Sequence, residues 1–358
     1  MTSRRALALL AAVVAAARGA RAEGLAPAKA AAVEAAIADA MRAASIPGLT
    51  AAVRVGDVLW TRGFGEADVE NHVPARPETL YRLASVSKPI TAVAAMQLAE
   101  AGRLDLDADV RRYVPGFPKK PWPVTTRQLL SHLGGIRHYR GEEWDSTRRY
   151  VSVLEGLDLF KDDPLLHEPG TRFVYSTHGY SLAGAVIEAV SGRPFVEQLR
   201  DTVFAPAGLT TARDDDGREL LRERAQGYER TPDGRLRNSA PSDTSYKVPG
   251  GGLVATAPDV ARFGAAFLEG RLVGTATATA MLAPQKTRDG RPVAYGLGWA
   301  VRAGGLPREA WHTGGQHRVS NVLLIRPDSG VVVVLLTNLE EAPGRIETAR
   351  RIAEIVER

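Results

Sequence analysis

Strand-forming segments stand at both ends of this 358-residue sequence, and the stretch between them has mostly helical and loop character. Near the N-terminus, residues 49–55 and 58–60 predict a hairpin across the turn Gly56-Asp57. Near the C-terminus, residues 319–326 and 331–337 predict a second hairpin. Strands at both ends that flank a helical middle predict one sheet built from both chain ends.

Helical patterns complete this layout. Residues 28–44 and 346–356 have apolar residues at helical spacing, and Thr125 with Gln128 indicates a capping box for a helix that runs to Leu133. Residues 295–301 and 309–312 add two short strands. The predicted fold class is therefore α+β, an antiparallel sheet flanked by helices. We expect the α/β part to span about 28–100 and 245–358, with a mostly helical insertion at about 101–244.

The first 22 residues have the layout of a secretory signal peptide. Arg4 and Arg5 precede an apolar run, and the run is followed by the small-x-small pattern Ala20-Arg21-Ala22. The run is too short to span a membrane. No acidic residue occurs before Glu23, so an organellar transit peptide is the competing interpretation. We expect a secreted or periplasmic protein whose mature chain is 23–358, with no stable membrane span.

Charge and cysteine usage narrow the function classes. The net charge is +5, but residues 1–22 carry four arginines and no acid, so the remaining chain has 5 − 4 = +1. No basic stripe interleaved with aromatic residues supports nucleic-acid binding. The sequence has no cysteine, which excludes disulfides and thiolate nucleophiles. The seven histidines lack metal-ligand spacing, so we expect neither a metal nor a cofactor.

A Ser-x-x-Lys pair, Ser85 and Lys88, opens a predicted buried helix. Residues three apart on a helix share one face. A serine hydroxyl needs a base to become a nucleophile, and burial would favour a neutral, proton-accepting Lys88. The start of the helix would also leave the Ser85 N–H unpaired. The pair therefore predicts an activated serine.

Other stretches compete weakly with this pair. Gly179-Tyr180-Ser181-Leu182-Ala183 resembles a nucleophile elbow, but residues 179–190 predict one continuous helix. Gly250-Gly251-Gly252 lacks the lysine of a phosphate-binding loop and indicates close backbone packing instead.

Three motifs in fixed order carry a family resemblance. Ser85-x-x-Lys88, Tyr175-Ser176-Thr177 and His312-Thr313-Gly314 resemble the Ser-x-x-Lys, Tyr-x-Asn and Lys/His-Thr-Gly motifs of the serine β-lactamase-like and penicillin-binding hydrolases. This family includes class C β-lactamases and D-alanyl-D-alanine carboxypeptidases. The resemblance runs from about Ala30 to Val356 and is greatest to the mitochondrial serine β-lactamase-like branch and its bacterial relatives. Stretches that support this branch are 131–139, 175–180 and 245–247.

The resemblance implies a role for each motif residue. Ser85 is the nucleophile, and Lys88 and Tyr175 share the proton transfers in an order that the sequence leaves open. The N–H groups of Ser85 and Gly315 would hold the oxyanion. Residues implied in substrate binding are His312, Thr313, Gly314, Gly315 and Thr177. Arg137, His138 and Tyr139 could line the rim or form a solvated loop.

Two departures from the family pattern bear on the substrate. Thr177 replaces the usual asparagine, which removes a side-chain amide donor for the acyl group. His312 replaces the lysine of β-lactamases, so we expect a group that titrates near pH 6.5 and meets a substrate carboxylate. Packing against Trp311 is the alternative role for this histidine. Both departures favour peptidases and esterases over efficient β-lactam hydrolysis.

The predicted function is that of a secreted serine hydrolase acting through an acyl-enzyme on Ser85. A peptide or amide substrate is the first choice, and a carboxylic ester or weak β-lactam hydrolysis is second. The alternative from another class is a non-catalytic filament or scaffold, because mitochondrial relatives assemble into filaments. Self-association is compatible with either. The intact set of Ser85, Lys88 and Tyr175 favours the enzyme.

Overall fold

The computed structural model describes residues 24–302 and 308–358. The expected signal peptide, residues 1–22, lies outside the described residues. No helix within the described ranges has the length and apolar character needed to cross a membrane.

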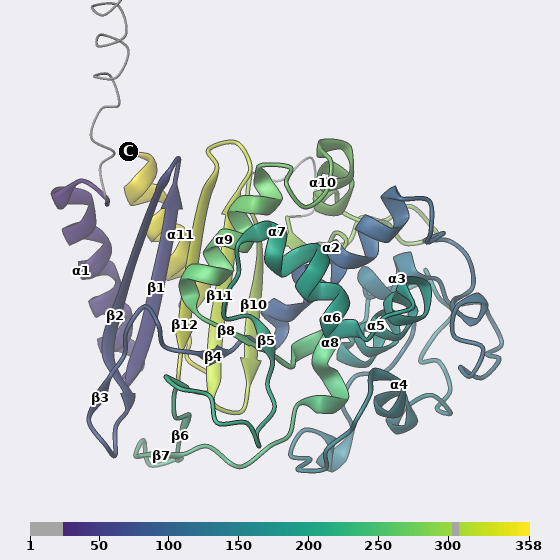
Figure 1. Cartoon of the computed structure of the whole chain (residues 1–358), viewed down its shortest axis with the longest axis horizontal. Coiled ribbons are helices and arrows are strands. Elements are labelled where there is room, and N and C mark those ends of the chain that lie inside the picture. Colours follow the sequence, from purple (N-terminus) through teal and green to yellow (C-terminus); the bar gives the residue numbers. More distant parts are fainter. Residues whose placement is uncertain (1–23, 303–307) are drawn as a thin grey trace, which may run out of the picture.

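The described residues hold a seven-stranded antiparallel sheet that joins the two ends of the chain (Figure 1). The strand order is β3-β2-β1-β12-β11-β10-β9. Strand β1 pairs with β12, with Leu49 opposite Thr337, so the predicted sheet from both chain ends is confirmed. The bounds are β1 (Gly48–Val55), β2 (Val58–Asp68), β3 (Val73–Pro74), β9 (Ala300–Val301), β10 (Ala310–Gln316), β11 (Val319–Arg326) and β12 (Val331–Thr337).

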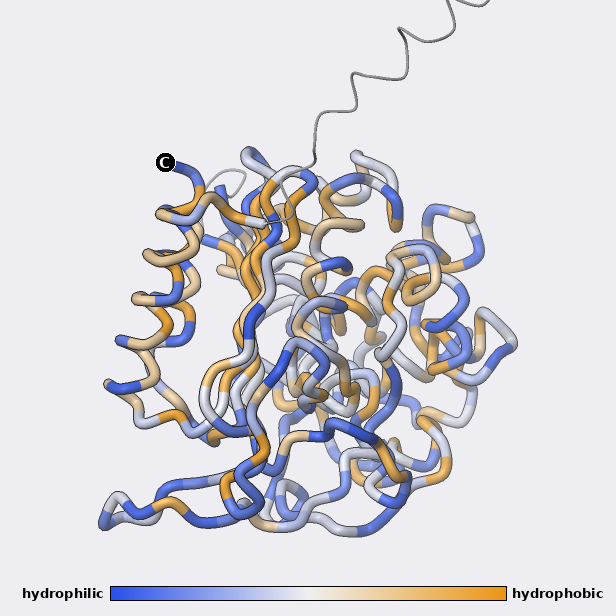
Figure 2. The backbone as a smooth tube through the Cα atoms, turned by 60° about the vertical axis from the view of Figure 1, so that its left-hand side comes forward, coloured by the Kyte–Doolittle hydropathy of each residue, from blue (hydrophilic) through white to orange (hydrophobic). Residues whose placement is uncertain are grey.

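Helices cover both faces of the sheet (Figures 1 and 2). Helices α1 (Pro27–Ala44) and α11 (Arg345–Glu357) pack on one face, and α9 (Ala257–Leu268) packs on the other. Strand β12 shows why: Val331, Val333 and Leu335 lie in the core under α1 and α11, while its alternate residues lie in the larger core. A strand buried on both faces is apolar throughout, as the sequence of β12 is.

The remaining elements form a second lobe beside the sheet. One hydrophobic core includes residues of both the sheet and this lobe, from Ala52 to Leu336. The helices not yet bounded are α2 (Ser87–Glu100), α3 (Thr126–Leu130), α4 (Val153–Gly156), α5 (Thr177–Ser191), α6 (Phe195–Leu199), α7 (Ala205–Ala207), α8 (Val248–Gly251) and α10 (Thr275–Leu282). The short strands are β4 (Tyr81–Arg82), β5 (Arg213–Asp214), β6 (Tyr228–Arg230), β7 (Leu236–Asn238) and β8 (Leu253–Ala255).

Two expected elements are shorter than the sequence indicated. The strand expected over 295–301 is reduced to β9, because the Leu297 and Gly298 N–H groups bond to carbonyls of α10 and α3 instead of a neighbouring strand. The capping box of α3 is confirmed, but the helix ends at Leu130. His132 lies two residues further on in a left-handed conformation, with φ 60°, which an α-helix does not accommodate.

Candidate active site

Ser85 lies in a short 3₁₀ turn, Ala84–Val86, that leads directly into α2. Ser85 is partly accessible, whereas the residues on both sides of it are buried. Ala84 has φ 50°, a conformation that costs energy for a residue with a Cβ and is typical of functional sites. The strained turn therefore presents one hydroxyl to solvent at the start of a buried helix.

The Lys88 amine contacts three oxygens in the buried base of this site. Its Nζ lies 3.0 Å from Ser85 Oγ, 3.2 Å from Thr177 Oγ1 and 2.6 Å from the Gly250 carbonyl oxygen. No acidic side chain pairs with it in the described residues. Burial, aided by the positive charge of Lys247, holds the pKa of Lys88 well below its ordinary value. A neutral amine fits the three contacts: two N–H groups donate to Gly250 and Thr177, and the lone pair accepts from Ser85.

Tyr175 closes the site above Lys88. Its phenol lies close enough to Ser85 for the serine hydroxyl to affect its pKa, and its ring centroid lies 4.9 Å from Lys88 Nζ. Burial raises the pKa of Tyr175 above its ordinary value, so the phenol keeps its proton at neutral pH. The structure thus brings together Ser85, Lys88 and Tyr175.

Thr177 reaches the same site from the first turn of α5. Ser176 caps this helix by accepting a hydrogen bond from the Gly179 N–H at 2.9 Å. This cap orients Tyr175 and Thr177 at the helix start. Thr177 Oγ1 contacts Lys88, and the Thr177 N–H donates to His138 Nδ1 at 3.2 Å.

Strand β10 forms the opposite wall. Gly314 is buried, and a Cβ there would lie 2.4 Å from the Leu83 carbonyl oxygen, so only glycine lets β10 pack against the Ser85 turn. Gly315 is exposed, and its nearest neighbour would be the Arg345 guanidinium at 3.8 Å. Strand β9 pairs only with Ala310 and Trp311. The rest of the β10 edge keeps backbone groups available for a substrate.

His312 differs from the expectation of a titrating, carboxylate-binding imidazole. It is buried, with Nδ1 2.7 Å from the Thr313 carbonyl oxygen and Nε2 2.8 Å from the Tyr295 hydroxyl. Nδ1 therefore donates, and Nε2 accepts from Tyr295. Burial lowers the pKa of His312 to about 3. The predicted titration near pH 6.5 is wrong, because the apolar surroundings disfavour the charged ring.

The loop after α3 supports the site through contacts with Tyr175 and Ser176. The Ser176 N–H donates to His132 Nδ1 at 3.1 Å, and the His132 ring lies 4.2 Å from the Tyr175 ring. Arg137 is buried and paired with Glu143 and Asp163, so it is structural and does not line a rim. Sequence reasoning did not identify His132 as a support, although its place before Gly134-Gly135 hinted at an unusual turn.

Burial and close packing explain two stretches that the sequence analysis weighed against Ser85. Ser181 is fully buried within α5 and donates to the Tyr246 carbonyl oxygen at 3.2 Å, so no substrate reaches it. The triple glycine is needed for packing: a Cβ on Gly250 would lie 2.6 Å from Thr177 Cγ2. Its carbonyl also binds Lys88, a role that no sequence signal indicates.

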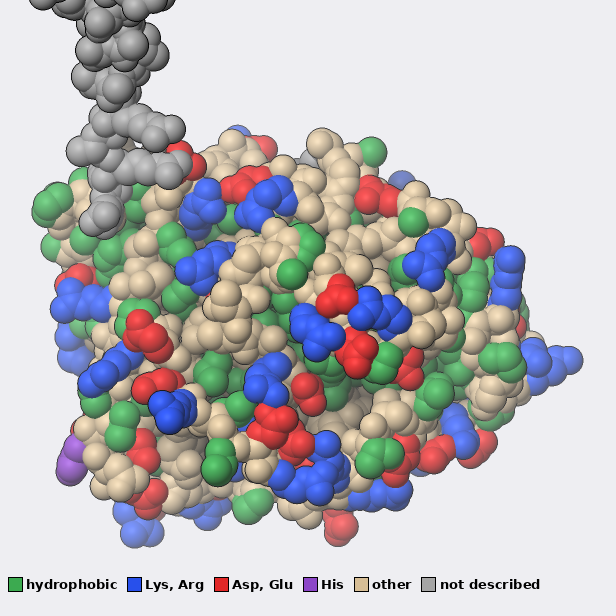
Figure 3. Space-filling view, in the orientation of Figure 1, with side chains coloured by type: hydrophobic (Ala, Val, Ile, Leu, Met, Phe, Trp, Pro, Cys, Tyr) green, Lys and Arg blue, Asp and Glu red, His purple; other side chains and the backbone are tan. Residues whose placement is uncertain are grey.

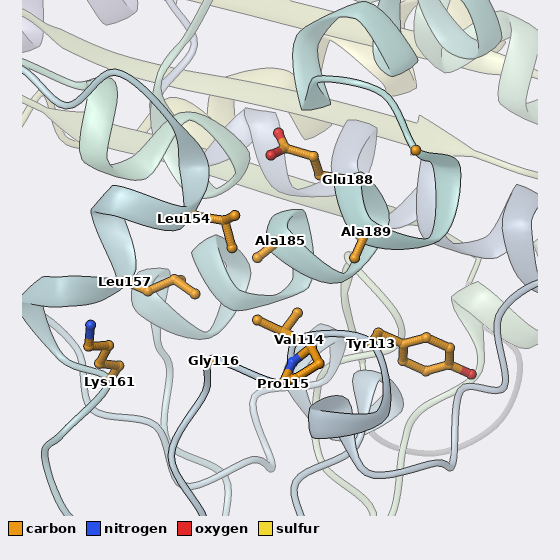
Figure 4. A pocket seen from close by; sticks show the side chains of 11 residues that line it. Tyr113, Val114, Pro115, Gly116, Leu154, Leu157, Lys161, Ala185, Glu188 and Ala189 are labelled. Carbon is orange, nitrogen blue, oxygen red and sulfur yellow. The ribbon is translucent and has the colours of Figure 1, made fainter.

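A separate hollow opens between α4, α5 and the loop around Val114 (Figure 4). Its volume is about 530 Å³, and Leu154, Leu157 and Ala185 contribute its apolar lining. Ser85, Lys88 and Tyr175 do not line it.

On the outer face seen in Figure 3, positive and negative side chains are interspersed.

Comparisons with known proteins agree with this geometry. The Beta-lactamase family profile matches residues 33–357. The human mitochondrial serine beta-lactamase-like protein LACTB is 31% identical over 416 aligned positions, covering 86% of this chain and 76% of the relative. An octameric penicillin-binding protein homologue from Pyrococcus abyssi superimposes with a TM-score of 0.78 at 25% identity, covering 92% of this chain and 77% of that one. EstCE1, a hydrolase with promiscuous acyltransferase activity, gives 0.75 at 25% identity, covering 92% and 98%.

Proposed function

The chain belongs to the β-lactamase family, and from this premise we propose that it is a serine hydrolase acting through an acyl-enzyme on Ser85. The observation that carries the proposal is the contact of 3.0 Å between Ser85 Oγ and a buried Lys88 that has no acidic partner among the described residues. A purely structural lysine would be paired with an acid or would extend to solvent.

The acylation step follows from the contacts. Ser85 Oγ attacks the substrate carbonyl carbon, and its proton moves to the neutral Lys88 amine. The N–H groups of Ser85 and Gly315 would stabilise the oxyanion that forms. Collapse of this intermediate breaks the bond to the leaving group, which takes up the proton from Lys88 by way of the Tyr175 phenol. Water then attacks the ester on Ser85, and the proton returns to Oγ.

The protonation states support an order that the sequence left open. Tyr175 keeps its proton because its pKa is raised, whereas the lowered pKa of Lys88 favours its neutral form. Lys88 is therefore the first acceptor, and Tyr175 serves as a proton donor and relay. A positioned donor matters most for an amine leaving group, so a peptide or amide substrate is the first choice. A carboxylic ester is second.

Replacement of the nucleophile tests this proposal. Ser85→Ala should lower turnover by about 10⁶-fold, as loss of a hydrolase nucleophile does. The matched control is Ser181→Ala, which removes a buried hydroxyl of α5 and should leave kcat within a few-fold of wild type. Hydrolysis rates are measured over a panel of D- and L-amino-acid amides, short-chain esters and cephalosporins. Equal activity of Ser85→Ala and wild type would refute the proposal.

We further propose export with cleavage after Ala22, because Arg4, Arg5 and the apolar run precede a small-x-small site. Protein recovered from the periplasm should begin at Glu23. An intact residue 1 or 2 on cytoplasmic protein would contradict export. Self-association of this chain stays a prediction.

A further inference from the structure

Lys247 is a buried cation that neither the fold nor the proposed reaction explains. It is 2% exposed and is the last residue of the 3₁₀ turn that precedes α8. Its Nζ lies 5.0 Å from the ring centroid of Tyr139 and 5.1 Å from those of Trp144 and Tyr246. Three aromatic faces therefore surround the ammonium.

The ammonium has no hydrogen-bond acceptor within residues 24–302 and 308–358. The two nearest acids are already engaged. Asp215 pairs with Arg82 at 2.6 Å and with Arg224 at 3.2 Å, and Asp243 accepts from the Ser245 N–H at 2.8 Å. A buried charge without a counter-ion is costly, and three N–H donors are left unused.

Lys247 is close enough to the reacting groups to affect them. Its charge lowers the pKa of Lys88 and of His138. The link is also structural, because the Tyr139 ring that Lys247 contacts lies 4.1 Å from the His138 ring, and His138 Nδ1 accepts a hydrogen bond from the N–H of Thr177, which in turn contacts Lys88. Thr177 stands where the family pattern has an asparagine for the acyl group, so these contacts link Lys247 to the residue at which that amide donor is missing.

We propose that Lys247 is a specificity-determining residue whose ammonium binds a carboxylate carried by the acyl part of the substrate. This inference rests on the proposed acylation of Ser85. A carboxylate would fill the unused donors and supply the missing counter-ion, whereas a neutral carbonyl would satisfy only the donors. The substrate class is therefore an amide or ester whose acyl group ends in an acid.

The binding should depend on pH. Burial, followed by repulsion from Arg82, lowers the pKa of Lys247 to about 7. Preference for an anionic acyl group should therefore be strong at pH 6 and weak at pH 9, where the amine is neutral. The titratable and charged groups that face Lys247 are Arg82, Asp215, Asp243, Lys88, His138, His178, Tyr139 and Tyr246.

The test compares two esters with the same coumarin leaving group. The acyl group of one is succinyl, with a free carboxylate, and that of the other is succinyl with the carboxylate capped as a methyl ester. The acylation rate constant of each ester is measured at low probe concentration. Any effect of Lys88 that is common to both esters drops out of the ratio of the two rate constants. In wild type we expect the ratio to fall about 10-fold or more from pH 6 to pH 9, with a midpoint near pH 7, as loss of a charge-assisted hydrogen bond predicts. Lys247→Met should lower the ratio at pH 6 by a similar factor.

Controls separate the possible failures. Lys247→Arg should keep the preference and lose its pH dependence, and Lys119→Met, which removes an exposed charge, should behave as wild type. If Lys247→Met does not fold, the wild-type pH profile still decides. Three results would overturn the inference about Lys247 and leave the proposed function standing. They are a wild-type ratio that does not change with pH, an unchanged ratio in folded Lys247→Met, and a preference seen only when the carboxylate is on the leaving group. Failure of both esters to acylate Ser85 would overturn the proposed function as well.

Discussion

At the scale of single residues, burial decides the chemistry of this site. Lys88 and His312 both lie beside apolar and aromatic groups, and burial lowers the pKa of both, which favours their neutral forms. For Lys88 the neutral form is the one that accepts a proton. For His312 it fixes a bridge between Tyr295 and the backbone of β10. The motifs alone predicted that Lys88 and His312 belong to the site. They did not predict the protonation state of the His312 imidazole, because desolvation depends on neighbours that are distant in sequence.

His312 should therefore keep one neutral tautomer across the physiological range. We expect the proton on Nδ1 and none on Nε2 from pH 5 to pH 8, because Nδ1 donates to Thr313 and Nε2 accepts from Tyr295. Nitrogen-15 NMR of histidine-labelled protein reports both nitrogens, and His312→Gln assigns the signal. A cationic ring that appears between pH 6 and pH 7 would contradict this state.

At the scale of elements, the packing of β10 against the Ser85 turn builds the site. Gly314 and Gly315 are adjacent in sequence but differ in surroundings. A Cβ on Gly314 would clash with the Leu83 carbonyl, whereas a Cβ on Gly315 would meet the Arg345 side chain at an ordinary van der Waals distance. Their place in a Thr-Gly-Gly run did not distinguish them. The difference comes from strand alternation, which places successive residues on opposite faces.

Alanine at these two positions should give opposite results. Gly314→Ala should destabilise the fold by about 1–3 kcal/mol and slow acylation, because the backbone around Leu83 has to shift. Gly315→Ala should leave stability within about 0.5 kcal/mol, as surface changes do, and affect mainly KM. Urea unfolding and steady-state kinetics measure both. Equal stability of the two variants would show that the approach of β10 to the turn does not constrain the site.

The longest periodic segments were the elements that the sequence predicted best. Strands 319–326 and 331–337 have the expected bounds, and residues 179–190 do form one helix, α5. Misses occurred where tertiary contacts override local pattern, as at Gly298, whose φ of 90° and bond to Leu130 break the expected strand. The sequence did not indicate the proposed role of Lys247, because Tyr139 and Trp144, two of the three rings around it, are distant from it in sequence.

At the scale of the whole molecule, buried histidines link stability to pH. Burial lowers the pKa of His132, His138 and His312. A lowered pKa means that the unfolded chain binds more protons below about pH 6.5, so these groups stabilise the fold above that pH and lose the effect as pH falls. His317 has the opposite sign. Glu340 and Asp145 raise its pKa, so its contribution is full below about pH 6.5 and is lost as pH rises.

Burial also lowers the pKa of His178, so four histidines oppose one, and the free energy of unfolding should decrease from pH 7 to pH 5. His312 alone should lower the free energy of unfolding by about 2 kcal/mol at pH 5, at about 1.4 kcal/mol for each pH unit below 6.5. Urea unfolding at the two pH values measures the change, and it should be smaller in His312→Gln. A protein that is equally stable or more stable at pH 5 would contradict this balance.

The most direct measurement of the central claim is the location of a covalent adduct. Wild-type protein is treated with a fluorophosphonate probe, digested with trypsin and analysed by tandem mass spectrometry. We predict the added mass on Ser85, resolved from Ser87 by fragmentation, with no adduct in Ser85→Ala and strongly slowed labelling in Lys88→Met. An adduct on Ser181 or another serine, or undiminished labelling of Ser85→Ala, would contradict the account.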